Sequence, residues 1–322
     1  MVRLESKQIK VIGASKVFLP SVMHPETPYF VLLLEDEHQN KWAHKSVKEY
    51  KIGDTFAVES AKTKDAVAIW RIKYNLEYAL SKILELLNGI KINANSKIVI
   101  LPTISEPKHP YLLKNTSPEL LTEVIKLLRA KGAESQNIKV AGQNVNKFGF
   151  DKIIQKSELK SVCEQYEIEC VNLAEGKFVK KSFENNTLSV SEIATNPDII
   201  INLPIVKLND RDGIEGASKN ILQLLEKPLQ PGDDLKNILS SLQSMLPATL
   251  NIAQADRITK SNGFISYLGL ALASFSSQNM DKTILGICMK DKSPDYLSGV
   301  DTNKIEIVGR QIKEVKYNIE AR

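Results

Sequence analysis

Residues 198–220 read DIIINLPIVKLNDRDGIEGASKN and are the most informative stretch of the chain. The apolar run at 199–201 is typical of a strand buried on both faces, and it ends at Pro204. A polar loop with two glycines then leads into the apolar segment 221–225, which has helical spacing. A buried strand, a glycine-containing loop and a helix start form the layout that places ligands at the carboxyl end of a parallel sheet. The stretch therefore predicts an α/β fold with a ligand site at this loop.

Two lysines, Lys207 and Lys219, flank the loop. They can clamp a phosphate or carboxylate at the helix start, where the backbone N–H groups of the first turn have no partner within the helix. Alternatively, they are solvated side chains that pair at the surface with Asp210, Asp212 and Glu215. From the residues alone, the two interpretations stand level.

Four further polar residues belong to the predicted site. Asn202 at the strand end and Asn220 at the helix start can bind a ligand or cap the loop backbone, and capping is the preferred interpretation. Asp256 and Asp281 lie near positions expected at the carboxyl edge of the sheet. Metal ligation or acid–base chemistry is open to such a carboxylate pair. The preferred alternative is a buried structural aspartate that holds loop N–H groups.

The bulk composition is that of an ordinary soluble protein. The chain has 322 residues, enough for about two domains. A net charge of +5 and a pI near 8.8 are too weak to indicate nucleic acid. No apolar segment predicts a signal peptide or a membrane helix. The cysteines are dispersed without a CxxC pattern, so we expect reduced thiols and a cytoplasmic location.

Metal and nucleotide motifs are poorly represented in the sequence. The cysteines are Cys163, Cys170 and Cys288, and no histidine follows His109. This inventory predicts neither a zinc site nor an iron–sulfur cluster. The sequence contains neither a Walker A pattern nor GxGxxG, so ATP and NAD binding are not predicted.

Residues 1–75 are predicted to form a small all-β domain. Short β-rich runs lie between turn signals, at 11–19, 29–34, 41–44, 55–58 and 66–74. Five short strands within about 70 residues favour a closed barrel over an open sheet, which would leave exposed edges. The patterning changes near Leu76, where we place the domain boundary.

Residues 76–322 are predicted to form a second, α/β domain. After a first helix at 76–87, short apolar strands alternate with amphipathic helices. The segment TSPE at 116–119 has the residues of a helix start, and Gly132 is typical of a helix end. Segment 177–190 is predicted to be a hairpin insertion. The alternation predicts a parallel or mixed doubly wound sheet with right-handed crossovers.

Several weak motifs follow one another in the larger segment. Residues 204–220 are similar to Pro-x-x-Lys-Thr-His followed by Thr-Gly-x-x-Lys-Asn, and 273–281, ASFSSQNMD, to Ala-Ser-x-Asp-Pro-x-Ala-x-Asp. A third match is NKIEIVG at 303–309. In this order, over about residues 95–312, the motifs resemble the family catalogued as domain of unknown function 362. Members of that family are sometimes fused to ferredoxin-like iron–sulfur modules.

The chain departs from the family pattern at several polar positions. It has Leu101-Pro102-Thr103 where the family usually has Lys-Pro-Asn. Asn209 replaces a histidine of the main loop, Glu215 a threonine, and Ser276 the first aspartate of the later motif. The three cysteines cannot replace the iron–sulfur module. Either the ligand differs from that of typical members or the chemistry has been lost.

The N-terminal segment has a resemblance of its own. Residues 27–35, TPYFVLLLE, with Ile52-Gly53-Asp54 before the next strand, resemble the OB-fold domain of acyl-CoA-associated proteins of unknown function. The match covers about 50 residues. It implies an OB-like barrel at the start of the chain.

We therefore expect a protein that binds a small anionic ligand at the 204–220 loop, as a carboxylate, phosphate or acyl-CoA-like group. Whether it turns the ligand over is open. The alternative is a non-catalytic assembly subunit that docks an acyl-CoA-handling enzyme through the OB-like domain. Single-stranded nucleic acid is disfavoured because residues 1–75 carry a net charge of only +3. The expected site residues are Lys207, Lys219, Asn220, Asn202, Asn209, Gly216, Asp256 and Asp281.

Overall fold

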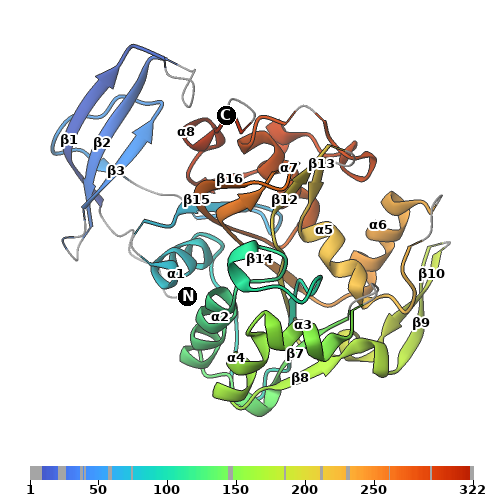
Figure 1. The fold of residues 1–322 in the computed structure, drawn as a ribbon. Helices are drawn as coiled ribbons and strands as arrows, with labels where there is room; N and C mark the ends of the chain where they lie inside the picture. The colour runs from blue at the N-terminus through green and yellow to red at the C-terminus, as the bar shows by residue number, and fades with distance from the viewer. Residues whose placement is uncertain are drawn as a thin grey trace.

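The central element of the fold is a ten-stranded mixed sheet (Figure 1). The computed structural model describes residues 9–20, 27–36, 39, 41–56, 60–73, 75–143, 148–184, 186–210, 213–229, 233–260, 262–290 and 292–319. Five strands of the sheet run parallel in the order β14 (Thr249–Thr259), β11 (Ile199–Leu203), β6 (Ile98–Pro102), β7 (Ile138–Gly142), β8 (Glu169–Asn172). Beyond β14 follow the antiparallel strands β15 (Ile265–Ser274) and β5 (Val67–Arg71), then β16 (Ile307–Gly309), parallel to β5.

Two hairpins complete the strands of the larger body. The hairpin of β12 (Lys207–Asn209) and β13 (Gly213–Glu215) pairs with the end of β14. The hairpin of β9 (Phe178–Phe183) and β10 (Asn186–Ser191) forms a separate sheet against α6 (Leu235–Met245). The second hairpin lies where the sequence predicted an insertion.

Helices cover both faces of the sheet. Alternate residues of β6 belong to two separate cores, with Ile98 and Ile100 in one and Val99 and Leu101 in the other. The first core contains α1 (Leu76–Leu86), α2 (Pro118–Ala130), α3 (Phe150–Lys156) and α4 (Leu159–Gln165). The second contains α5 (Ala217–Asn220), α6, α7 (Ser277–Ile287) and α8 (Ile312–Val315). The 3-10 turns are Pro110–Leu112, Ser135–Asn137, Leu173–Glu175, Glu192–Ala194, Ile221–Leu224, Asp295–Leu297 and Thr302–Lys304. The sheet contains parallel and antiparallel pairs, and helices cover both of its faces. The predicted α/β class with a mixed sheet is therefore confirmed.

The start of α2 shows how the local sequence sets an element. The Ser117 side chain accepts a hydrogen bond from Leu120 N at 3.3 Å, and Pro118 occupies the first helical position. Both residues suit a helix start because the first N–H groups have no partner within the helix. The predicted beginning of this helix is therefore confirmed.

The N-terminal region forms a second sheet, which we call the N-terminal sheet, seen at the upper left of Figure 1. Its antiparallel order is β3 (Lys41–Ser46), β2 (Tyr29–Glu35), β1 (Ile9–Val17), β4 (Thr55–Phe56). Alternate residues of β2 are buried and join the core that contains α1. Trp42 of β3 lies 6.4 Å from Trp70 of β5 between ring centroids. The inner face of the N-terminal sheet therefore packs on the larger body.

The expected five-stranded barrel needs correction at its last strand. The segment 66–74 supplies β5, which pairs with β15 and β16 in the large sheet and not with the N-terminal strands. The physical reason is the unbroken apolar run from Ala66 to Trp70, which is buried throughout. Such a run suits a strand covered on both faces, whereas a barrel wall needs alternation. The domain division at residue 75 remains a prediction, although β5 belongs to the large sheet.

Among the described residues, no helix is long and apolar enough to cross a membrane.

Candidate functional site

Asp281 lies at the centre of the 204–220 loop region. This residue of α7 is fully buried, and its carboxylate accepts Ala217 N at 2.7 Å and Ser218 N at 2.9 Å. A Cβ atom at Gly216 would overlap the carboxylate, which explains the glycine before α5. Burial raises the pKa of Asp281 to about 6, although the two N–H groups and the Lys219 charge oppose the shift. Two N–H groups that we expected to meet a ligand are therefore bonded to an internal carboxylate.

The asparagines tie the strand ends to α5. Asn202 is fully buried, and its amide donates to Ala217 O at 3.0 Å and to Asn251 Oδ1 at 2.7 Å. Asn220 donates to Asn202 Oδ1 at 2.7 Å and accepts from Thr103 Oγ1 at the same distance. The amides join the carboxyl ends of β6 and β11 to α5 and β14. Of these contacts, the bond to Ala217 O is of the backbone-capping kind, and the others join polar side chains to one another.

The two lysines have different surroundings. Lys207 Nζ lies 3.0 Å from Glu215 Oε2 across the β12–β13 hairpin, and Asn209 Nδ2 lies 3.4 Å from Glu215 Oε1. Lys207 thus has the surface partner of the second interpretation. Lys219 lies on α5 and is half-buried, with its charge acting on Asp281. Asp212 lies outside the described residues.

Asp256 and Asp281 have different partners in the structure. Asp256 Oδ2 lies 3.4 Å from Arg257 Nε on β14, whereas Asp281 holds the start of α5. In the part of the chain that the structure describes, no group of three or more His, Cys, Asp or Glu side chains is placed to hold a metal ion.

A large groove of about 1090 Å³ opens at the amino end of α7. We call it the α7 groove. It lies between the 60–65 loop, the end of α1, the starts of β11 and β14, and the second half of α6. The cationic side chains of its lining are Lys62, Lys64 and Lys91. The amide and hydroxyl side chains include Gln243, Asn251, Ser277 and Gln278, and the apolar ones include Leu87, Ile90, Ile199, Leu246 and Phe275. Asp65 and Asp198 also line it.

The 60–65 loop is fixed beside the start of α7. The Glu306 carboxylate accepts Lys62 N and Thr63 N, each at 2.8 Å, and Thr63 Oγ1 at 2.7 Å. Asn279 of α7 donates to Asp65 O at 2.8 Å. These contacts hold a loop that carries two exposed lysines against the first turn of α7, a helix end where the dipole favours negative charge.

Hydrogen bonds connect residues that line the groove to residues of the stretch 202–220. Asn251 lines the groove and accepts from Asn202. Ser277 Oγ lies 3.3 Å from Ser218 Oγ and also accepts from the Gln243 amide. Asn202 and Ser218, from the stretch that the sequence analysis singled out, thus contact Asn251 and Ser277 of the groove wall.

The segment 273–281 forms the end of β15, the groove wall and the first turns of α7. Ser276 stands where the resembling family has an aspartate, and its side chain accepts Asn279 N at 3.2 Å as the helix cap. Serine and aspartate are both strong helix caps, so this departure preserves the local structure.

Known proteins are similar to this chain in structure and in sequence family. The lactate racemase apoprotein from Thermoanaerobacterium thermosaccharolyticum is similar to this chain with 12% identity and a TM-score of 0.42. The alignment covers 68% of this chain and 56% of that protein, so the chain spans little more than half of its length. A search of curated proteins finds no match. The model described as "Domain of unknown function (DUF362)" matches residues 98–285, more than half of the chain, and the chain therefore belongs to that family.

Proposed function

We propose that the protein binds a small amphipathic anion, of the acyl-CoA type, in the α7 groove. The observation that carries the proposal is a groove of about 1090 Å³ whose lining includes lysines, the amino end of α7 and apolar side chains. Sites for small molecules usually enclose about 300–1,000 Å³. The groove therefore has room for a ligand much larger than a phosphate ion.

The two kinds of lining match the two parts of such a ligand. Lys62 and Lys64 offer ammonium groups on a loop that is hydrogen-bonded to the first turn of α7, and both the positive charge and the helix dipole favour phosphate or carboxylate oxygens. Ile199, Leu246 and Phe275 offer apolar surface for an acyl or pantetheine-like portion. Gln243 and Gln278 add amides that can orient polar groups in between.

The 204–220 loop itself is a poor anion site. At the loop, Asp281 already accepts Ala217 N and Ser218 N, and Lys207 is paired with Glu215. An anion there would have to compete with a buried carboxylate. The loop residues instead hold the groove wall in place.

The double substitution Lys62→Ala/Lys64→Ala is expected to weaken coenzyme A binding by about 30-fold or more, because each charge-assisted contact contributes about 1–3 kcal/mol and two are removed. Folding should change little, since both side chains are exposed and the loop is held by its backbone N–H groups. Isothermal titration calorimetry with coenzyme A, and with inorganic phosphate as the smaller probe, measures the effect.

The matched control is Lys207→Ala/Lys219→Ala, which removes the same charge from the loop. We expect it to leave coenzyme A affinity within about twofold of the native value. If the loop variant abolishes binding and the groove variant does not, the anion binds at the loop and the groove assignment is wrong. Absence of binding of both probes to the native protein would refute the proposed function.

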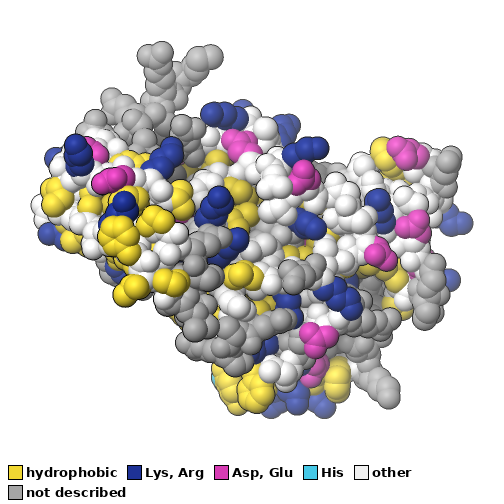
Figure 2. Space-filling view, turned by 90° about the horizontal axis from the view of Figure 1, so that it is seen from above, with side chains coloured by type: hydrophobic (Ala, Val, Ile, Leu, Met, Phe, Trp, Pro, Cys, Tyr) yellow, Lys and Arg dark blue, Asp and Glu magenta, His cyan; other side chains and the backbone are white. Residues whose placement is uncertain are grey.

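A second candidate function comes from apolar side chains exposed on the N-terminal sheet. Leu19 is 82% exposed, and Phe18, Leu33, Val47 and Ile52 are also exposed. Figure 2 shows hydrophobic side chains gathered on this side of the molecule, at the left of the view. Exposed apolar patches are typical of protein-binding surfaces. We infer from them that an acyl-CoA-handling enzyme docks on the N-terminal sheet, as the OB-like resemblance implies.

The variant Leu19→Ser/Ile52→Ser should lose this partner. The full chain would be purified from its own cells, and co-purifying proteins quantified by mass spectrometry. We expect an acyl-CoA-handling enzyme with the native chain and at least a tenfold decrease with the variant. Phe264→Ser, which changes an equally exposed side chain on the larger body, is the control and should retain the partner. Equal recovery with all three proteins would contradict this docking surface.

A further inference from the structure

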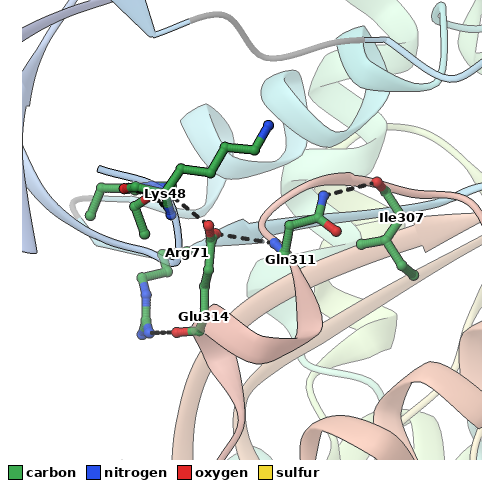
Figure 3. Close-up of polar contacts among 7 residues, drawn as sticks. Lys48, Arg71, Ile307, Gln311 and Glu314 are labelled. Atoms are coloured by element: carbon green, nitrogen blue, oxygen red, sulfur yellow. Dashed lines mark hydrogen bonds and ion pairs between the residues drawn. The ribbon is translucent and has the colours of Figure 1, made fainter. Parts of the chain in front are cut away.

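Glu314 lies buried between the N-terminal sheet and the larger body. Its Oε1 atom is 3.5 Å from Nε2 of His44 on β3, and both side chains are buried. Its Oε2 atom accepts Gln311 N at 3.1 Å, which caps α8 (Figure 3). A carboxylate at the amino end of α8 is thus also the contact of α8 with the N-terminal sheet.

Cationic groups face this carboxylate from three elements. Arg71 of β5 donates to the main-chain oxygen of Glu314 at 3.4 Å (Figure 3), and the charges of Arg71 and of Lys45 on β3 act on the carboxylate. Arg310 is only 2% exposed and lies 5.7 Å from the centroid of the Trp70 ring. Its Nε and Nη1 atoms have no hydrogen-bond partner among the described residues. The contact region therefore contains several charged groups with little access to water, so the protonation state of Glu314 affects docking.

The segment that contains Glu314 also binds the rim of the α7 groove. Glu306, eight residues before Glu314, accepts the N–H groups of Lys62 and Thr63 on the groove rim. Between the two carboxylates lies β16, which pairs with β5, with Ile307 opposite Val67. Glu306 and Glu314 are thus the two ends of one segment, attached to the groove rim and to the N-terminal sheet.

We propose that segment 306–314 couples docking of the N-terminal sheet to the rim of the α7 groove, with protonation of Glu314 as the signal. Docking of the N-terminal sheet and the order of the groove rim can both be measured without a ligand. The consequence for ligand affinity rests on the function proposed above. The 60–65 loop reinforces the coupling, because it connects the N-terminal sheet to β5 and forms the rim.

The direction of the effect follows from burial. Burial raises the pKa of Glu314 from 4.5 to about 7, against the Gln311 N–H group and the charges of Arg310, Arg71 and Lys45. The state in which the N-terminal sheet is docked on the larger body therefore binds this proton more tightly than a state in which the sheet is released from it. This contribution to docking is fully present below pH 4.5 and is lost as the pH rises through 7. Between pH 6 and pH 8 the docking equilibrium should weaken about tenfold.

Hydrogen exchange of the full chain tests the coupling without a ligand. Rates corrected for intrinsic exchange would be compared at pH 6 and pH 8. In the native protein, we expect protection of β1–β3 and of the Lys62 and Thr63 amides to fall together, by about tenfold, at pH 8. Glu314→Gln, which keeps the oxygen that caps α8, should show equal protection at both values. Glu306→Gln is the control: the rim amides lose protection, while β1–β3 retain the native pH response.

Coenzyme A titrations at the same two pH values give the second readout. The native affinity should fall by up to about tenfold from pH 6 to pH 8, and Glu314→Gln should remove the part due to docking. Native protection of β1–β3 that does not change with pH would overturn the switch. Sheet protection that changes while rim protection does not would overturn the coupling. Parallel changes in both without coenzyme A binding at either pH would support the coupling and refute only the proposed function.

Discussion

Asp281→Ala is expected to lower the free energy of unfolding by about 2–6 kcal/mol. The substitution leaves two buried donors, Ala217 N and Ser218 N, without an acceptor. Each buried donor that loses its partner costs about 1–3 kcal/mol. Urea unfolding followed by circular dichroism measures the change. Asp256→Ala is the control, because that aspartate is partly exposed and pairs with Arg257, so its loss should cost about 0–1 kcal/mol. Equal stability of the two variants would contradict the structural role of Asp281.

The same carboxyl group makes stability depend on pH in a direction opposite to that of most aspartates. Its pKa rises from 3.8 to about 6 on folding, because burial disfavours the charge. The folded state therefore holds the proton more tightly, and the contribution to stability is full below pH 3.8 and lost as the pH rises through 6. At about 1.36 kcal/mol per pH unit, it amounts to about 3 kcal/mol. The stability difference between the native protein and Asp281→Ala should therefore widen on acidification from pH 7 to pH 4.

Elements that depend on local sequence were predictable. The strand at 199–203, the start of α2 at Ser117 and the hairpin at 178–191 all follow from periodicity, capping and turn residues. Segment 66–74 was predicted as a strand but assigned to the wrong sheet. Its partners, β15 and β16, lie about 200 residues or more later in the chain, and no local pattern encodes such pairing.

The candidate site divides in the same way. Asn202, Asn220 and Asp281 were recognised because polar residues at strand ends and helix starts serve either a ligand or the backbone. The structure gives them backbone and mutual contacts. The α7 groove was missed because its lining comes from segments of the chain between residues 61 and 279, most of which have no motif by themselves. Only the ASFSSQNMD segment at 273–281 pointed to this place.

The family-like segment NKIEIVG ends in a glycine whose role is steric. Gly309 has φ +80°, and a Cβ atom there would overlap the carbonyl oxygen of Ile69 on the neighbouring strand. That oxygen accepts Arg310 N at 2.9 Å. Glycine at this position therefore allows β16 to approach β5 and directs Arg310 toward Trp70. The resemblance marked the position, but only the structure supplies the reason.

Gly309→Ala should accordingly destabilise the protein by about 2–5 kcal/mol, since a left-handed backbone conformation costs about 1–2 kcal/mol and displacement from Ile69 breaks a buried hydrogen bond. Gly299→Ala is the matched control: its Cβ would meet no atom within 4 Å, and we expect a change below about 1 kcal/mol. Urea unfolding compares the two variants. Because β16 joins the groove rim to the docked N-terminal sheet, Gly309→Ala should also reduce exchange protection of the Lys62 amide and of β1–β3 at pH 6. Native protection of both regions in a destabilised Gly309→Ala protein would mean that β16 does not connect them.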